Sequence, residues 1–291
     1  MSRAGAPGTL RTGLAGDGWL RWVAVDVAPA LADVRDRLDL SPIATAALGQ
    51  ALASAALLFR LSLKSLDRIS IEIRGDGPLR KVYAEADLEG NLRGAVGEPQ
   101  LDLPPQAGGG LAVNKALGQG MLKVRRELPE QGAYESQVAL SGGEMANQLA
   151  HFLAQSEQTR SAVLLGVLLK PQGIRAAGGI IVEAFPGVAE ETLSKLEANI
   201  GSLPGVGEMF DQGGIDGALA RVFEGVGFES LDSQDVRYRC RCSRGRLLEM
   251  LESLPREELQ PLRSPEDGTI PAECGFCGAV YRYAIDEISP N

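Results

Sequence analysis

Four cysteines in the last fifth of the 291-residue chain constrain its fold more than any other feature. They form two local pairs, Cys240-Arg241-Cys242 and Cys274-Gly275-Phe276-Cys277. In an extended backbone, residues i and i+2 point to the same face about 6.6 Å apart, and side-chain rotation can bring their sulfurs to the roughly 3.8 Å that tetrahedral zinc requires. A C-x-x-C turn followed by glycine is typical of zinc knuckles. We therefore expect Cys240, Cys242, Cys274 and Cys277 to bind one zinc ion.

The segment that carries these pairs is predicted to be a small α+β module over residues 236–291. Between the pairs, the leucines at 247, 248, 251 and 254 pattern one short helix, and Pro255 can open a second. A module of this size has too little core to be stable alone. Structural zinc contributes on the order of 10–16 kcal/mol. The metal is therefore expected to decide whether the module folds.

Arginines crowd the cysteines in the sequence. They are Arg237, Arg239, Arg241, Arg244, Arg246 and Arg282. Positive neighbours lower the pKa of a thiol and increase the thiolate fraction available to a metal or an oxidant. The alternative is that these arginines are solvated or pair with nearby Asp and Glu.

Residues 19–185 are predicted to form an α+β core domain with a mixed sheet. Ser41-Pro42 begins an apolar helix that extends to Leu63, and Ile69, Ile71 and Ile73 then alternate with polar residues as in a strand. Further strands are predicted at 82–86, 92–96, 121–128, 134–140, 162–169 and 174–184. Because strands and helices do not alternate regularly, an α+β class is favoured over α/β.

Residues 186–235 are predicted to be a metastable helical linker. Two apolar stripes, one beginning at Leu193 and one at Ile215, have helical spacing, but eight glycines between Gly201 and Gly227 interrupt them. Each glycine inside a helix costs about 1 kcal/mol relative to alanine. The alternative is that these glycines only end helices and shape turns. Residues 1–18 match no pattern and are expected to be disordered.

The composition limits the partners and the location. The net charge of −9 repels phosphate backbones and anionic lipid, so neither nucleic acid nor membrane is an expected partner. The longest apolar runs, around Ala51–Phe59 and Ala162–Leu169, are shorter than the ~20 residues of a membrane span. Cysteines without an export signal indicate metal or redox chemistry in a reducing compartment, and we expect the cytoplasm.

Several motifs resemble the heat-shock protein 33 family, also called the 33 kDa chaperonin, from about Trp19 to Ile285. The residues that carry the resemblance are Gln234-Asp235-Val236 before Cys240-Arg241-Cys242-Ser243-Arg244, then Cys274-Gly275-Phe276-Cys277-Gly278, Gly75-Asp76-Gly77-Pro78-Leu79, Arg93-Gly94, Ser156-Glu157-Gln158 and Ala177-Gly178-Gly179. The spacing of the paired cysteines is the specific part of this set.

The resemblance implies a redox-regulated, ATP-independent holdase chaperone and not an enzyme. It implies that the reduced form binds one zinc per chain and is inactive. Oxidation would form the disulfides Cys240–Cys242 and Cys274–Cys277, release zinc and unfold the linker. The active form would be a homodimer that binds unfolding client proteins.

Two other functions stay open on the residues alone. A static zinc ribbon could bind nucleic acid or another partner, although the acidic surroundings of the cysteines disfavour nucleic acid. A thiol–disulfide oxidoreductase could use the C-x-x-C pair, but no thioredoxin-like βαβ pattern surrounds it. His151, the only histidine, has no identifiable nucleophile near it and is interpreted as structural or surface.

Overall fold

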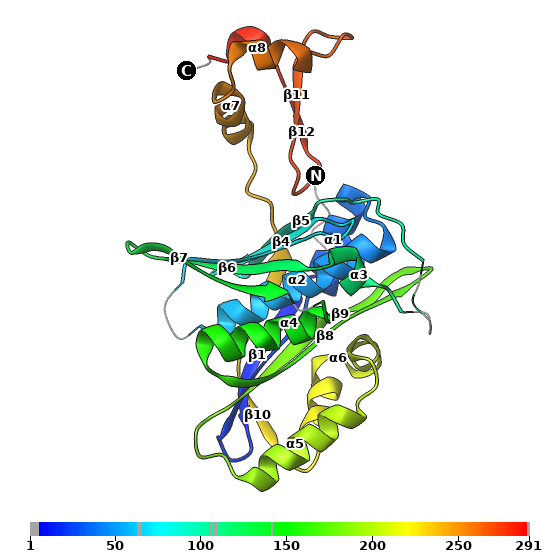
Figure 1. The fold of residues 1–291 in the computed structure, drawn as a ribbon, viewed down its shortest axis with the longest axis vertical. Coiled ribbons are helices and arrows are strands. Elements are labelled where there is room, and N and C mark those ends of the chain that lie inside the picture. Colours follow the sequence, from blue (N-terminus) through cyan, green and yellow to red (C-terminus); the bar gives the residue numbers. More distant parts are fainter. Residues whose placement is uncertain (1–5, 63–65, 105, 107–109, 141, 290–291) are drawn as a thin grey trace. The chain divides into compact units, whose positions relative to one another are not determined.

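The computed structural model describes residues 6–62, 66–104, 106, 110–140 and 142–289, and the chain divides into two compact units. Unit 1 extends to Tyr238, and unit 2 comprises Arg239 onwards (Figure 1). The predicted α+β class is confirmed. Each unit is described separately below.

A ten-stranded sheet runs through unit 1 in the order β7-β6-β3-β4-β5-β10-β1-β2-β9-β8. All neighbouring strands are antiparallel except β10 and β5, which run parallel over two residue pairs. The strands are β1 (Gly8–Ala15), β2 (Leu20–Asp26), β3 (Arg68–Gly75), β4 (Lys81–Asp87), β5 (Asn91–Val96), β6 (Gly120–Leu128), β7 (Gly132–Leu140), β8 (Arg160–Lys170), β9 (Gly173–Ala184) and β10 (Phe228–Tyr238).

The main core of unit 1 forms around helix α2 (Pro42–Leu61). As expected, Ser41 caps this helix, and its hydroxyl accepts a hydrogen bond from the Ala44 amide at 3.3 Å. By length and composition alone α2 could cross a membrane, but 83% of its apolar stretch is buried inside the protein, as in a core helix. The other helices of this core are α1 (Ala28–Leu38), α3 (Val113–Leu117) and α4 (Met145–Phe152), and a π-helical turn (Leu153–Glu157) follows α4.

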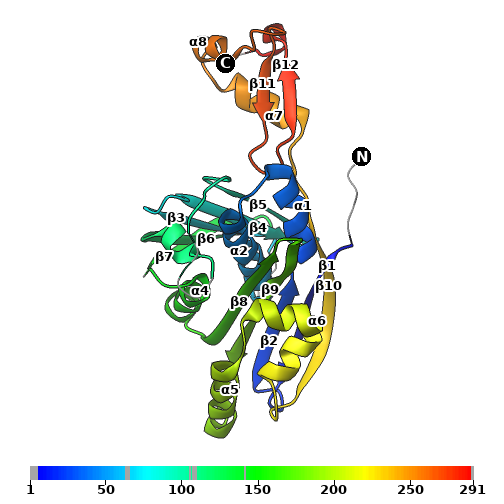
Figure 2. The same ribbon diagram turned by 90° about the vertical axis from the view of Figure 1, so that its right-hand side faces the viewer.

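A second apolar layer covers the opposite face of β1, β2 and β9, and it is formed by α5 (Glu190–Ser202) and α6 (Val206–Val222) (Figure 2). The two faces follow the period of two: along β2, Trp22 and Ala24 belong to this second layer, whereas Val23 and Val25 belong to the main core. Gly178 in β9 permits close docking, because a Cβ there would lie 2.7 Å from the Phe210 ring of α6.

The two predicted helices of the 186–235 segment are confirmed, but its boundaries with the core are wrong. Both helices belong to unit 1, and residues 228–238 form β10 inside the main sheet. β10 is highly polar and largely exposed, so its sequence lacks an apolar alternation; its backbone is held by pairing with β1 and β5.

The expectation that residues 1–18 are disordered is wrong for Gly8–Ala15. This segment is β1, which pairs with β10 on one side and β2 on the other. Its glycines and threonines give a weak strand signal, and the tertiary partners supply the hydrogen bonds that fix it. The predicted core of 19–185 therefore lacks two strands of its own sheet.

Unit 2 is a small α+β module, as predicted, beginning at Arg239 rather than 236. Helices α7 (Arg244–Glu252) and α8 (Arg256–Leu259) follow the first cysteine pair, and strands β11 (Ile270–Glu273) and β12 (Val280–Tyr283) form an antiparallel hairpin. Its hydrophobic core consists of Leu247, Leu251, Leu259, Ile270, Ala272, Tyr283 and Ile288. This core is small, as expected for a module that needs an additional cross-link.

Candidate metal centre

The four cysteines selected from the sequence lie together at one end of the β11–β12 hairpin. Their Sγ atoms are all within 4.8 Å of one another. Cys240 Sγ lies 3.6 Å from Cys274 Sγ, and Cys242 Sγ lies 3.4 Å from Cys277 Sγ. These separations are close to the roughly 3.8 Å between sulfurs around a tetrahedral metal. The arrangement can hold one metal ion.

Local backbone structure places each pair differently. Strand β10 ends at Tyr238, so the first pair lies outside it. Instead, the Cys242 amide donates a hydrogen bond to Cys240 Sγ at 3.4 Å. The short separation of the two residues therefore still directs both sulfurs to one point.

The second pair occupies the turn of the β11–β12 hairpin. The amides of Cys277 and Gly278 donate to the Cys274 carbonyl at 3.1 and 2.8 Å, and the Cys274 amide donates to the Ala279 carbonyl at 2.9 Å. Gly278 has a φ of 67°, in the left-handed region that favours glycine. This is the tight turn expected of a C-x-x-C-G knuckle.

Burial makes the metal-free site unfavourable for four thiolates. Burial raises the pKa of the Cys240 thiol to about 11 and also raises the pKa of the Cys277 thiol. Burial also opposes ionisation of Cys242, but hydrogen bonds from Tyr281 and Cys277 outweigh it and lower the pKa of Cys242. Thiolates gathered so closely require a cation, because a metal ion stabilises the deprotonated form of its ligands. The donor set therefore fits a thiophilic metal such as zinc.

Several arginines near the cysteines bind acids or carbonyls, in agreement with the alternative considered from the sequence. Arg244 donates to Glu287 and to the Arg282 carbonyl, both at 2.7 Å, and its guanidinium stacks 4.4 Å from the Tyr283 ring centroid. Arg282 pairs with Asp267 at 3.2 Å. These arginines hold the module's last segment against its hairpin and helix.

The position of Tyr281 beside a sulfur was not predicted from the sequence. Its hydroxyl lies 3.7 Å from Cys242 Sγ, and this hydrogen bond raises the pKa of Tyr281 to about 12. The four-residue distance from Cys277 carries no signal for this contact, which depends on the hairpin register.

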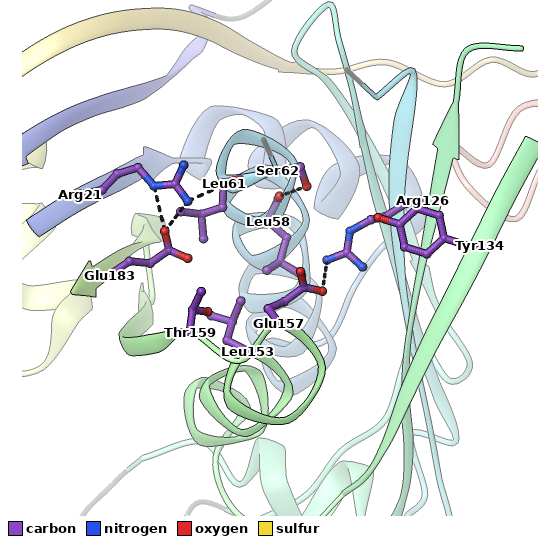
Figure 3. Close-up of a pocket in the computed structure, with 10 residues that line it drawn as sticks. All are labelled: Arg21, Leu58, Leu61, Ser62, Arg126, Tyr134, Leu153, Glu157, Thr159 and Glu183. Atoms are coloured by element: carbon purple, nitrogen blue, oxygen red, sulfur yellow. Dashed lines mark hydrogen bonds and ion pairs between the residues drawn. The ribbon is translucent and has the colours of Figure 1, made fainter. Parts of the chain in front are cut away.

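A cavity of about 280 Å³ in unit 1 explains another of the sequence motifs (Figure 3). Glu157, from Ser156-Glu157-Gln158, accepts a hydrogen bond from the buried Arg126 at 2.9 Å. On the opposite wall, Arg21 donates to Glu183 at 2.8 Å and to the Leu61 carbonyl at 3.2 Å. Glu157 thus gives the buried Arg126 a carboxylate partner, which is a structural role for this residue of the motif.

Comparison with known proteins gives a consistent result across sequence and structure. The family model described as Hsp33 protein matches residues 9–284. A 33 kDa chaperonin of Thermus thermophilus is 42% identical, covering 97% of this chain and 85% of the relative. One from Symbiobacterium thermophilum is 41% identical, covering 88% and 87%. The crystal structure of a 33 kDa chaperonin from Thermotoga maritima superposes with a TM-score of 0.88 at 31% identity, covering 98% of this chain and 97% of that one.

Proposed function

Because this chain belongs to the Hsp33 protein family, we propose that it is a redox-regulated, ATP-independent holdase chaperone. It is inactive while the four cysteines are reduced and bind zinc, and active after their oxidation. The observation that carries the proposal is the four-cysteine cluster, built from one local pair at the start of unit 2 and one in its hairpin turn. The family supplies the chaperone class, and the cluster supplies the redox chemistry.

The proposed zinc ligands are Cys240, Cys242, Cys274 and Cys277. When bound, zinc supplies a cross-link between the start of unit 2 and its hairpin turn. The residues themselves hold the thiolates at the required spacing through the Cys242 amide and the Cys274–Gly278 turn. Four-thiolate sites of this kind are structural rather than catalytic, since all coordination positions are filled.

Oxidation is proposed to pair neighbouring cysteines, Cys240 with Cys242 and Cys274 with Cys277. For each pair, one peroxide takes two electrons from two thiolates and two protons from solvent, forming one S–S bond and two waters. The sulfur distances do not select this pairing, because the closest contacts run between the pairs. The pairing is the one that the resemblance to the family implies. Disulfides within each pair would close short loops and leave the start of unit 2 and its hairpin turn without a cross-link, whereas disulfides between the pairs would keep that cross-link.

We propose that unfolding of unit 2 destabilises the segment formed by α5, α6 and β10. Its two helices are bound to the rest of unit 1 chiefly by the second apolar layer, and β10 is bound by backbone pairing with β1 and β5. The ion pairs of the segment are exposed, and each contributes about 0–1 kcal/mol. Those pairs join Arg11 to Asp216, Arg175 to Asp211 and Arg60 to Asp232. Release of the two helices would uncover Leu20, Trp22, Ile180 and Val182 of the sheet. An apolar surface of this kind binds unfolding clients.

The remaining parts of the proposal follow from the family. The active oxidised form is proposed to be a homodimer. The protein is proposed to act in the cytoplasm, where the cysteines are normally reduced and the chaperone is therefore inactive. Unfolding proteins are its partners, and neither nucleic acid nor membrane is required.

The central test is suppression of client aggregation. We expect the reduced, zinc-loaded protein to leave light scattering by a heat-unfolding client unchanged. After peroxide with mild heating, scattering should fall, and a chromogenic chelator should detect one zinc released per chain. Equal suppression by the reduced protein would refute the switch. Catalytic turnover of disulfides would instead favour the oxidoreductase.

Two glycines of α6 offer a matched test of linker stability. The space beside Gly217 is open where an alanine Cβ would lie, so Gly217→Ala should stabilise the helix by about 0.5–1 kcal/mol and raise the temperature needed for activation. Gly214 has a φ of 59° and a ψ of −155° inside the helix, so Gly214→Ala should destabilise it and lower that temperature. Hydrogen exchange of α6 amides measures both shifts. If both variants shift the activation temperature in the same direction, the stability of α6 does not limit activation.

A further inference from the structure

The phenol of Tyr281 contacts one sulfur of the candidate metal centre. Tyr281 is the second residue of β12, where pairing with Ala272 fixes its backbone. Its hydroxyl oxygen lies 3.7 Å from Cys242 Sγ. The Cys274–Gly278 turn and the strand register therefore place this side chain at the metal centre together with the cysteines.

The four sulfurs consequently differ in their surroundings. Cys240 Sγ receives a backbone amide hydrogen bond, whereas Cys242 Sγ is reached by a side-chain hydroxyl. Cys274 and Cys277 are buried, with 7% of each exposed, while Cys240 and Cys242 are half-buried. An accessible thiolate is the more exposed to electrophiles. Cys242 is thus accessible and also carries a hydrogen bond that a single substitution can remove.

A hydrogen bond to a thiolate withdraws electron density from the sulfur. This reduces its nucleophilicity toward alkylating agents and peroxides, and it holds the sulfur in the orientation that a metal needs. Outer-shell partners of metal ligands typically change metal affinity or reactivity by about 10–100-fold when they are removed. The expected effect is large enough to measure at a single cysteine.

We propose that Tyr281 is a positioning residue of the metal centre: its hydroxyl donates to the Cys242 thiolate, holds it in the site and restrains its reactivity. The inference rests on the proposed function only in taking Cys242 to be a zinc ligand. Of the two half-buried cysteines, Cys240 and Cys242, only Cys242 is then restrained by a tyrosine hydroxyl. The Tyr281 hydroxyl therefore controls how readily the sulfurs of this pair dissociate from the metal.

The matched variants are Tyr281→Phe and Tyr283→Phe, which remove the same atom two residues apart on β12. The phenylalanine of Tyr281→Phe keeps a ring at a partly buried position of the unit 2 core. The Tyr283 hydroxyl donates to the Arg244 carbonyl at 2.7 Å and not to a sulfur. Any general loosening of the module should therefore appear in Tyr283→Phe, whereas a sulfur-specific effect should appear in Tyr281→Phe alone.

The experiment uses the full-length, reduced, zinc-loaded protein without any client. Brief iodoacetamide treatment followed by mass spectrometry gives the labelling of Cys242 relative to Cys277, and a chromogenic chelator gives the rate of zinc transfer. We expect Tyr281→Phe to raise the Cys242 to Cys277 labelling ratio about tenfold and to speed zinc transfer. Tyr283→Phe should leave the ratio at the wild-type value.

An unchanged ratio in Tyr281→Phe, or an equal rise in both variants, would overturn the role of Tyr281. Either result is independent of holdase activity, which is measured separately with a client. If the holdase switch is normal but the labelling ratio is unchanged in Tyr281→Phe, only the role of Tyr281 is contradicted. If Tyr281→Phe raises the labelling ratio tenfold but the oxidised protein never suppresses aggregation, only the proposed holdase function is contradicted.

Discussion

Withdrawal of the metal from the reduced protein is expected to unfold residues 239–291 while unit 1 keeps its structure. The hydrophobic core of unit 2 is limited to a few residues of two short helices and a two-stranded hairpin. Such a core cannot offset the entropy of ordering about 50 residues. A four-thiolate zinc site supplies on the order of 10–16 kcal/mol, which exceeds the total stability of a typical small domain.

Hydrogen exchange measured with and without a strong chelator checks this prediction. Amides of α7, β11 and β12 should lose protection together, whereas amides of α2 and the main sheet should retain it. Cys274→Ser should reproduce the loss without a chelator, because it removes one ligand. Full protection of the β11–β12 hairpin in metal-free protein would show that the module folds on its own core.

Leu219→Ala is expected to make the reduced, zinc-loaded protein bind clients. Leu219 is fully buried in the apolar layer that joins α6 to β2 and β9. Truncation of a buried leucine costs about 2–5 kcal/mol, so the docking equilibrium of the linker helices should shift by at least about 25-fold. The main core is a separate cluster around α2 and should remain intact.

Leu231→Ala is the control, because Leu231 lies in the same segment of the chain but is 62% exposed. Aggregation suppression by the reduced variants gives the functional comparison. Fluorescence gives the structural one: Trp22 is buried and packs edge-on against Phe228 at 6.1 Å, so undocking should shift its emission to the red. A red shift without client binding would show that the uncovered face is not the binding surface.

Much of the fold could be predicted from the sequence where patterns were strong. The strands with clear alternation, such as Ile69–Ile73, and the capped apolar helix after Ser41 lie where they were expected. The linker helices were also found from their apolar stripes, although glycines interrupt them. In each case the spacing of the buried apolar residues predicts a helix or a strand, so the local sequence is sufficient to identify it.

The strands that the sequence did not reveal are those that depend on distant partners. β1 is rich in glycine and threonine, and β10 carries charges along its exposed length. Each is a strand because its backbone pairs with segments from the other end of unit 1. No pattern within eight or eleven residues can record such a partner, and so both were assigned to disordered or linker segments.

The candidate site shows the same division. The spacing of the cysteines was sufficient to predict that the four sulfurs gather. The Tyr281 contact and the close approach of sulfurs between the two pairs depend on hairpin register and on how the first pair turns after Tyr238. These are tertiary details that residue spacing does not contain.

The central place of β10 in the sheet sets the order in which unit 1 can be completed. β10 is the last strand of this sheet along the chain, yet it lies between β1 and β5. In a nascent chain, the edges of β1 and β5 that pair with β10 therefore stay unpaired until residue 238 has been synthesised. Because pairing of β1 with β10 joins the two ends of unit 1, we expect it to be a slow step of folding. If oxidation releases β10 as proposed, the strand must re-enter the sheet between β1 and β5 after reduction, so refolding of the reduced protein should be slower than rebinding of its metal.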